Sequence, residues 1–405
     1  MLLVLLCLVA DTVHAQVTDD EKEEIPVYRE QFPGLPFYSY GSGLGITTPD
    51  STYRLNIRFR MQNRATYLQV EDEDPVVEAV VRRLRLRFDG FVGDPRFLYA
   101  IQLSFAPGDV GTLTEGQNIN IIRDAVMFYR PNNSWNFAFG QTKLPGNRQR
   151  VNSSGALQLT DRTINNATFT IDRDYGLQAY YLKERSDRFS YIVKTAVSTG
   201  DGRNWTQNPS TGLAYTGRLE LFPLGVFTAG GAQFEGDLMR EETPKLLLAG
   251  TYHFNDSAQR TRGQLGSELF ERRDITSLHL DGMMKYRGWA FQTAFMNRTT
   301  DNPITSDPSN PDNVRFVQTG HGFDAQLSYL FKNDLELIGR FSTQTPGSEI
   351  RELTPERDQY SVGITQYIWE HSLKLQTEFT YNDHTLPGSD APNSWYLRFQ
   401  VEIGI

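Results

Sequence analysis

Apolar and polar residues alternate along most of the chain. From Tyr53 to Gln62 every second residue is apolar, and the residues between them are Arg, Asn or Gln. A similar alternation runs from Trp395 to Ile405. A period of two places successive side chains on opposite faces of a β-strand. Sixteen runs of this kind are found, and convincing helical periodicity is absent. They lie at residues 53–62, 81–91, 97–105, 121–129, 135–143, 175–181, 189–197, 213–221, 246–254, 276–286, 289–298, 323–329, 335–341, 360–368, 373–381 and 395–405.

The connections between these runs are sorted by length. Short turns such as residues 286–288 alternate with long loops such as 144–172, and the one exception is the connection 223–244. Aromatic residues cluster beside the short turns, as Trp135 and Trp289 do. Short turns at one end, long loops at the other and a girdle of aromatics are typical of outer-membrane barrels. We therefore predict an all-β fold, a transmembrane antiparallel up-and-down β-barrel of about 16 strands, or eighteen if residues 225–234 form a hairpin.

The first residues are of a different kind. An apolar run, MLLVLLCLVA, precedes the small-residue site Val13-His14-Ala15, which predicts a signal peptide at 1–15 and export to the outer membrane of a Gram-negative cell. Residues 16–45 are acidic and then rich in Pro and Gly, and we expect a loosely ordered periplasmic leader. Residues 46–405 then form the barrel, and the long loop 144–172 is a candidate to fold into its lumen.

Composition excludes several classes of function. The only cysteine, Cys7, lies in the apolar run, so a disulfide and a cysteine-based metal site are excluded. The chain carries 49 acidic and 40 basic residues, which argues against a nucleic-acid partner. It has no G-x-S-x-G or H-E-x-x-H motif. Ser277, His279 and Asp281 share one strand face, an arrangement that period-two spacing produces by chance, so we expect no enzyme, metal or cofactor.

The polar face of the first two predicted strands is rich in arginine. In a barrel this face lines the lumen, and arginine suits oxyanions because its planar fork donates two parallel hydrogen bonds. If loop 144–172 folds inward, it adds Arg162 and further bases. Alternatively, the arginines pair with carboxylates on neighbouring strands, such as Glu220 and Glu402. The candidate pore-lining, anion-binding residues are Arg54, Arg58, Arg60, Arg64, Arg83, Arg85, Arg87, Lys143, Arg148 and Arg150.

Three stretches resemble the phosphate-selective porin O and P family: STYRLNIRFRMQNR, the segment from FAFGQTKLPGNR to DYGLQAYY, and RLELFPLGVF with PKLLLAGTYHF. The resemblance covers residues 43–405, and Lys143 and Arg148 fall on the family's K-x-P-x-x-R-like segment. The chain departs from the usual pattern at Ile405, where outer-membrane barrels normally end in an aromatic residue. The resemblance implies a sixteen-stranded barrel, usually trimeric, that admits small solutes by diffusion.

Together these features predict an outer-membrane porin for passive diffusion of small hydrophilic solutes. An Arg/Lys-lined lumen favours anions such as phosphate or other oxyanions. The expected partners are outer-membrane lipid, small anions and two further copies in a homotrimer. The alternative is a barrel that binds, anchors or adheres to a partner and does not conduct.

Overall fold

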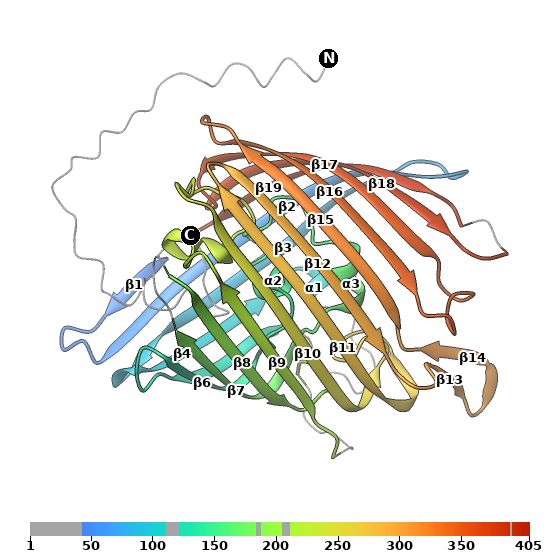
Figure 1. The fold of residues 1–405 in the computed structure, drawn as a ribbon, viewed down its shortest axis with the longest axis horizontal. Helices are drawn as coiled ribbons and strands as arrows, with labels where there is room; N and C mark the ends of the chain where they lie inside the picture. Colours follow the sequence, from blue (N-terminus) through green and yellow to red (C-terminus); the bar gives the residue numbers. More distant parts are fainter. Residues whose placement is uncertain (1–42, 111–120, 184–187, 205–210, 389–390) are drawn as a thin grey trace.

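A computed structural model describes residues 43–110, 121–183, 188–204, 211–388 and 391–405. The predicted signal peptide and residues 16–42 of the predicted leader lie outside the described residues. Within them, sixteen strands form one closed antiparallel barrel in which each strand pairs with the next along the sheet (Figure 1). These strands are β2 (Tyr53–Val70), β3 (Val76–Val92), β4 (Asp94–Ser104), β5 (Ile122–Tyr129), β6 (Trp135–Lys143), β7 (Arg173–Lys183), β8 (Ser190–Ser198), β9 (Ala214–Phe222), β10 (Lys245–Arg260), β11 (Glu268–Tyr286), β12 (Trp289–Thr299), β15 (Gly320–Leu330), β16 (Leu335–Pro346), β17 (Glu356–Trp369), β18 (Leu373–Thr385) and β19 (Ser394–Gly404).

The barrel closes between its last and first long strands. β19 pairs antiparallel with β2, from Ser394 opposite Val70 to Gly404 opposite Arg60. A closed sheet leaves no unpaired edge within a bilayer, where an unsatisfied backbone group costs several kcal/mol. The prediction of an antiparallel barrel of about sixteen strands is therefore confirmed.

A short strand, β1 (Leu44–Thr47), continues the sheet past the end of β19 by pairing with residues 54–57 of β2. The predicted leader boundary at residue 45 therefore falls inside a strand. Apolar–polar alternation does not predict this strand, because its residues are exposed on both faces and neither face has to be apolar.

Alternation in the sequence corresponds to an apolar outer face and a polar inner face. In β18, Lys374 and Glu378 are fully buried on the inner side, whereas Phe379 is 45% exposed on the outer side. Exposed aromatics gather beside the short turns, where Phe97 stacks on Tyr129 with ring centroids 4.9 Å apart. This is the distribution of a lipid-facing band with an interfacial girdle. Among the described residues, no helix is long and apolar enough to cross a membrane.

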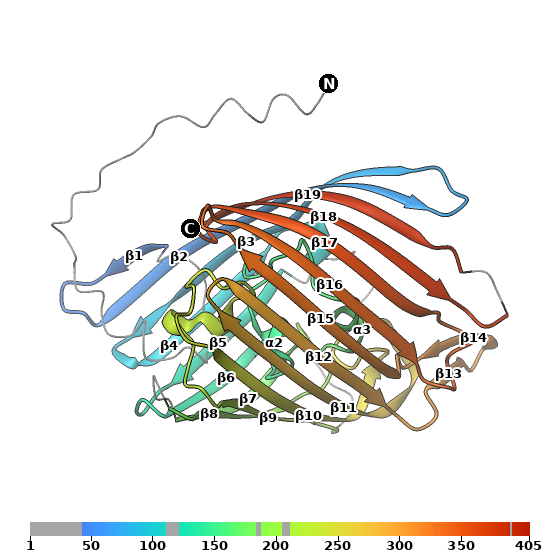
Figure 2. The same ribbon diagram turned by 45° about the horizontal axis from the view of Figure 1, so that its top comes forward.

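Several strands run further than the alternation predicts. The predicted loop 255–274 is mostly a hairpin of β10 and β11, with only residues 261–267 between them. The β2–β3 hairpin likewise extends beyond β4, whose pairing with β3 ends at Arg85 (Figure 2). Loop 300–319 also contains a separate hairpin, β13 (Ile304–Asp307) with β14 (Asn310–Phe316). Both faces of a strand meet water beyond the membrane, so the sequence there need not alternate.

The irregular connection 223–244 forms a 3₁₀ element, η2 (Thr228–Gln233), and no hairpin. Phe222 precedes this connection and is only 3% exposed, and its ring centroid lies 6.4 Å from that of Phe227. Leu247 and Met283 belong to the same small apolar cluster. The connection thus turns inward and buries its own apolar residues, and the eighteen-strand alternative is wrong.

Candidate functional site: the arginine-lined lumen

The segment 144–172, which carries α2 (Arg148–Val151) and α3 (Ile164–Phe169), lies inside the barrel (Figure 1). Lys374 of β18 donates from Nζ to the carbonyl oxygens of Gly155 and Leu157 at 2.8 and 2.6 Å. Arg298 of β12 donates to the Thr170 carbonyl at 3.1 Å. Hydrogen bonds from strands at several positions around the barrel therefore fix the backbone of this segment, and its position inside the lumen narrows the open space.

A glycine on the wall lets α3 approach closely. The amide of Asn165 donates to the carbonyl oxygens of Phe323 and Thr343 at 3.1 and 3.0 Å. A Cβ placed on Gly322 would lie 1.9 Å from Asn165 Oδ1. Any larger residue at 322 would have to displace that side chain, so the absence of a side chain there is a requirement of the inward fold.

Between this segment and the wall of β2 to β7 lies a cavity of about 850 Å³ that is open to solvent. Nine of its sixteen lining residues are cationic, and none of the sixteen is Asp or Glu. The lining residues are Arg58, Phe59, Arg60, Arg85, Arg87, Gln102, Arg123, Lys143, Arg150, Ser153, Ser154, Arg162, Arg173, His371, Gly404 and Ile405.

Carboxylates stand behind this lining, but there are fewer of them. Within the described residues, seven of the nine cations form ion pairs with five carboxylates, those of Asp89, Asp109, Asp124, Asp172 and Glu402. Lys143 and Arg162 instead donate to backbone carbonyls of the segment, at Val151 and Gln149, both at 2.7 Å. The cavity therefore carries an excess of positive charge, and an anion that enters it gains attraction without a matching cost of repulsion.

One of these carboxylates shows how strongly the cations act. Asp109 belongs to α1 (Pro107–Val110) and accepts from Arg85 at 2.8 Å and from Arg123 at 3.1 Å. Burial by itself raises the pKa of Asp109, but the two guanidinium groups hold that pKa well below its usual range. The carboxylate consequently stays ionised and cancels only part of the charge of its two partners.

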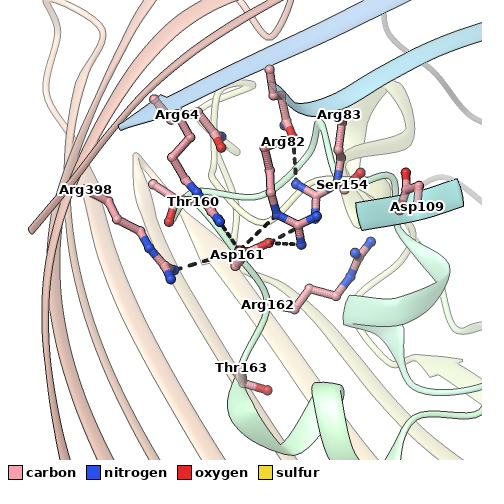
Figure 3. A network of polar contacts seen from close by, with 12 residues as sticks. Arg64, Arg82, Arg83, Asp109, Ser154, Thr160, Asp161, Arg162, Thr163 and Arg398 are labelled. Atoms are coloured by element: carbon pink, nitrogen blue, oxygen red, sulfur yellow. Dashed lines mark hydrogen bonds and ion pairs between the residues drawn. The ribbon is translucent and has the colours of Figure 1, made fainter. Parts of the chain in front are cut away.

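A second arginine cluster surrounds Asp161 of the inward segment (Figure 3). Arg64 contacts its carboxylate at 2.5 Å, and Arg82 and Arg83 contact it at 2.9 and 3.0 Å. Arg398 of β19 lies 3.8 Å away. Burial favours protonation, yet Arg83, Arg82 and Arg64 keep the pKa of Asp161 well below its usual range. Four guanidinium groups thus meet one carboxylate.

Alternation does not predict two of the arginines, Arg82 and Arg123, because β-bulges interrupt it. In the β2–β3 pair, Gln62 opposes Arg83 and Asn63 opposes Val81, so Arg82 is the extra residue. In the β4–β5 pair, Gln102 opposes Asp124 and Leu103 opposes Ile122, which leaves Arg123 unpaired in the same way. A bulge shifts the phase of a strand, and side chains that strict alternation assigns to the lipid face reach the lumen.

Residues 55–227 match the family model for phosphate-selective porin O and P. The match spans both arginine clusters except Arg398 and includes the whole inward segment. Over these residues the chain is similar to the phosphate-selective porin O and P family. As a porin it is an outer-membrane channel for small solutes, not an enzyme. No curated protein sequence matches it significantly.

Solved structures share the fold of this porin. The outer-membrane channel DcaP of Acinetobacter baumannii is similar with a TM-score of 0.54 at 11% identity, over 89% of this chain and 99% of that one. OmpF of Salmonella typhi, in complex with daunomycin, gives 0.52 at 12% identity over 89% and 100%. OmpT of Vibrio cholerae gives 0.50 at 11% identity over 89% and 100%. At these identities the likeness shows the barrel fold and nothing finer.

The ten candidate residues fall in different places in this porin. Six of them line the cavity: Arg58, Arg60, Arg85, Arg87, Lys143 and Arg150. Arg64 and Arg83 contact Asp161 instead. Arg54 donates to Asn56 at 3.2 Å near the short-turn end of β2. Arg82, Arg123, Arg173 and Arg398 were not among the predicted residues, and Arg162 was predicted only as one of the bases that loop 144–172 would add.

The tenth candidate, Arg148, belongs to a network on the other side of the inward segment. It contacts Glu220, which also pairs with Lys194 at 2.9 Å and Arg218 at 2.7 Å. Arg218 in turn pairs with Asp281 at 2.7 Å. Three cations meet two carboxylates here, and Arg218 and Glu220 are fully buried. This network has one more cation than carboxylates and fixes the segment to the wall, whereas the open cavity holds the larger excess of positive charge.

Proposed function

We propose that this porin is a passive pore that favours small anions, in particular phosphate or other oxyanions. The cavity that carries this proposal has nine cationic lining residues, and among the described residues they form ion pairs with five carboxylates. Fixed cations along a water-filled path raise the local concentration of anions and lower that of cations. The guanidinium forks suit oxyanions because each can donate two parallel hydrogen bonds.

The inward segment 144–172 is proposed to confine the path to the arginine wall. Its opposite face is attached by the buried network of Glu220, so solutes pass on the side of β2 to β7. We further propose a homotrimer embedded in outer-membrane lipid, as the family resemblance implies. Residues 1–15 would serve as the signal peptide and the following residues as a periplasmic leader.

The test is the reversal potential of single channels in a planar bilayer under a KCl gradient. We expect a potential of the sign set by chloride, because chloride is attracted to the lining and potassium is repelled. A potential of the opposite sign would refute the anion preference. A correctly folded barrel without conductance would instead support the alternative, a barrel that binds or anchors a partner. Folding is checked by the mobility shift between unheated and heated samples on a gel.

A further inference from the structure

The cluster around Asp161 contains more donors than this one side chain can satisfy. A carboxylate offers about four lone-pair positions. Oδ2 accepts from Arg64 and from Nε of Arg82, and Oδ1 accepts from Arg82 and Arg83. All four positions are therefore taken. Arg398, at 3.8 Å, is too far away for a hydrogen bond, and it lies over the ring of Tyr396 with its guanidinium carbon 3.8 Å from the centroid.

Unused donors and unbalanced charge remain in the same place. The Nε atoms of Arg64 and Arg398 are buried and have no hydrogen-bond partner among the described residues. Four positive charges face one negative charge. The side chains of Asp161, Arg82 and Arg398 are 22%, 26% and 19% exposed, so the cluster is open to small solutes.

The backbone at Asp161 is held independently of its carboxylate. Thr160 donates from its amide and its hydroxyl to Glu378 at 2.9 and 2.6 Å. Arg340 donates to the carbonyl oxygen of Asp161 at 2.9 Å. Arg162 donates to the carbonyls of Gln149 and Asn152. The side chain of Asp161 can consequently leave the arginines while the segment stays in place.

We propose that Arg64, Arg82, Arg83 and Arg398 form an oxyanion-binding site that the Asp161 carboxylate occupies as an internal competitor. A free oxyanion with two charges and three or more oxygens satisfies more of the donors than Asp161 does, so it displaces that side chain. The site lies on the path toward the cavity: Arg64 is six residues beyond Arg58 on β2, about 20 Å along the strand. Asp161 thereby sets how tightly the outer part of the pore holds each anion.

This inference rests on the proposed anion preference and adds a prediction of its own. The probe is inorganic phosphate, added to wild-type channels that carry a chloride current, with half-maximal block as the readout. In Asp161→Asn, which keeps the size of the side chain and removes its charge, phosphate should block at a concentration lower by about fivefold or more. Asp94→Asn, on an exposed residue at the short-turn end of β4, is the matched control and should leave the block unchanged.

A double variant separates competition from a simple change of charge. Asp161→Asn with Arg398→Gln has the same net charge as the wild-type cluster but no internal competitor. We expect phosphate to block it at a concentration at least about twofold below the wild-type value. A double variant identical to wild type would mean that net charge alone acts, and would overturn the proposal.

Arg398→Gln by itself keeps every hydrogen bond to Asp161 and should weaken the phosphate block about twofold or more. This variant also decides the question if Asp161→Asn fails to give a heat-modifiable barrel. Unchanged phosphate block in Arg398→Gln refutes the site. An anion-selective wild type with no response in any variant overturns this inference alone, whereas a wild type without anion preference overturns the proposed function.

Discussion

Removal of Arg87 is the cleanest test of how the cavity charge sets selectivity. Arg87 and its partner Asp89 are both on β3, with Nε 3.0 Å from Oδ1. Arg58 also contacts Asp89, at 3.4 Å. In Arg87→Gln, Asp89 therefore keeps a cation, and the excess of positive charge in the cavity falls by one. The Arg87–Asp89 ion pair lies within a single strand, so the shape of the pore should persist in the variant.

The size of the effect follows from Coulomb attraction. A chloride ion 4 Å from a guanidinium in water gains about 1 kcal/mol, which is about a fivefold change in its local occupancy. Ions that pass further away gain less, so we expect the chloride-to-potassium permeability ratio to fall about two- to fivefold. At about 0.1 M salt the Debye length is about 10 Å, and at 1 M it is about 3 Å. The difference from wild type should therefore shrink strongly at high salt.

Reversal potentials at the two salt concentrations measure this directly. The matched control is Arg96→Gln, because Arg96 forms the same kind of pair with Asp94 at 2.7 Å but is exposed outside the cavity. It should leave the permeability ratio unchanged. An Arg87→Gln channel with wild-type selectivity at low salt, or a shift that persists at high salt, would show that the cavity charge does not control permeation.

Two stability predictions concern the attachment of the inward segment. Glu220→Gln removes the carboxylate that pairs with three buried cations. We expect it to lower the free energy of unfolding by about 3–5 kcal/mol, measured by denaturant titration of the protein in lipid vesicles. The control is Glu271→Gln, which breaks an ion pair in which Glu271 is 64% exposed and should lower the free energy of unfolding by less than about 1 kcal/mol. Equal losses of stability in the two variants would contradict the importance of the buried network. Gly322→Ala must displace Asn165 and should cost about 1–3 kcal/mol by the same titration. Gly339→Ala on β16, where a Cβ meets no atom within 4 Å, should be neutral, and equal stability of the two variants would refute the close-packing argument.

Much of the barrel could be predicted because lipid imposes a strict rule on each strand. A residue between membrane interfaces faces either lipid or lumen, so the pattern from Tyr53 to Gln62 leaves one assignment of faces. The rule does not apply where the chain leaves the membrane, because both faces of a strand then meet water. For this reason β10 and β11 extend past the ends that alternation predicts. The rule also does not apply inside the lumen, where connection 223–244 buries Phe222 and Phe227 against each other. No periodicity distinguishes such a segment from a loop in water.

Only the residues that the strands contribute to the candidate site could be predicted from the sequence. Alternation places Arg58, Arg60, Arg85 and Arg87 on the polar face, and these side chains line the cavity. The bulge that brings in Arg82 leaves no mark in the sequence, because two adjacent arginines are equally compatible with one residue on each face.

The origin of the carboxylates explains why charge and shape are linked in this pore. The partners that the sequence suggested for the arginines were carboxylates on neighbouring strands, and Glu402 is one of them. Asp109, Asp161 and Asp172, however, come from segments between strands, and each pairs with arginines of the wall or the segment itself. The same contacts therefore neutralise cations and attach lumenal segments. A change at most of these arginines alters the selectivity and the opening of the pore together. The Arg87–Asp89 pair lies within one strand, so a change at Arg87 is expected to alter selectivity without altering the opening of the pore.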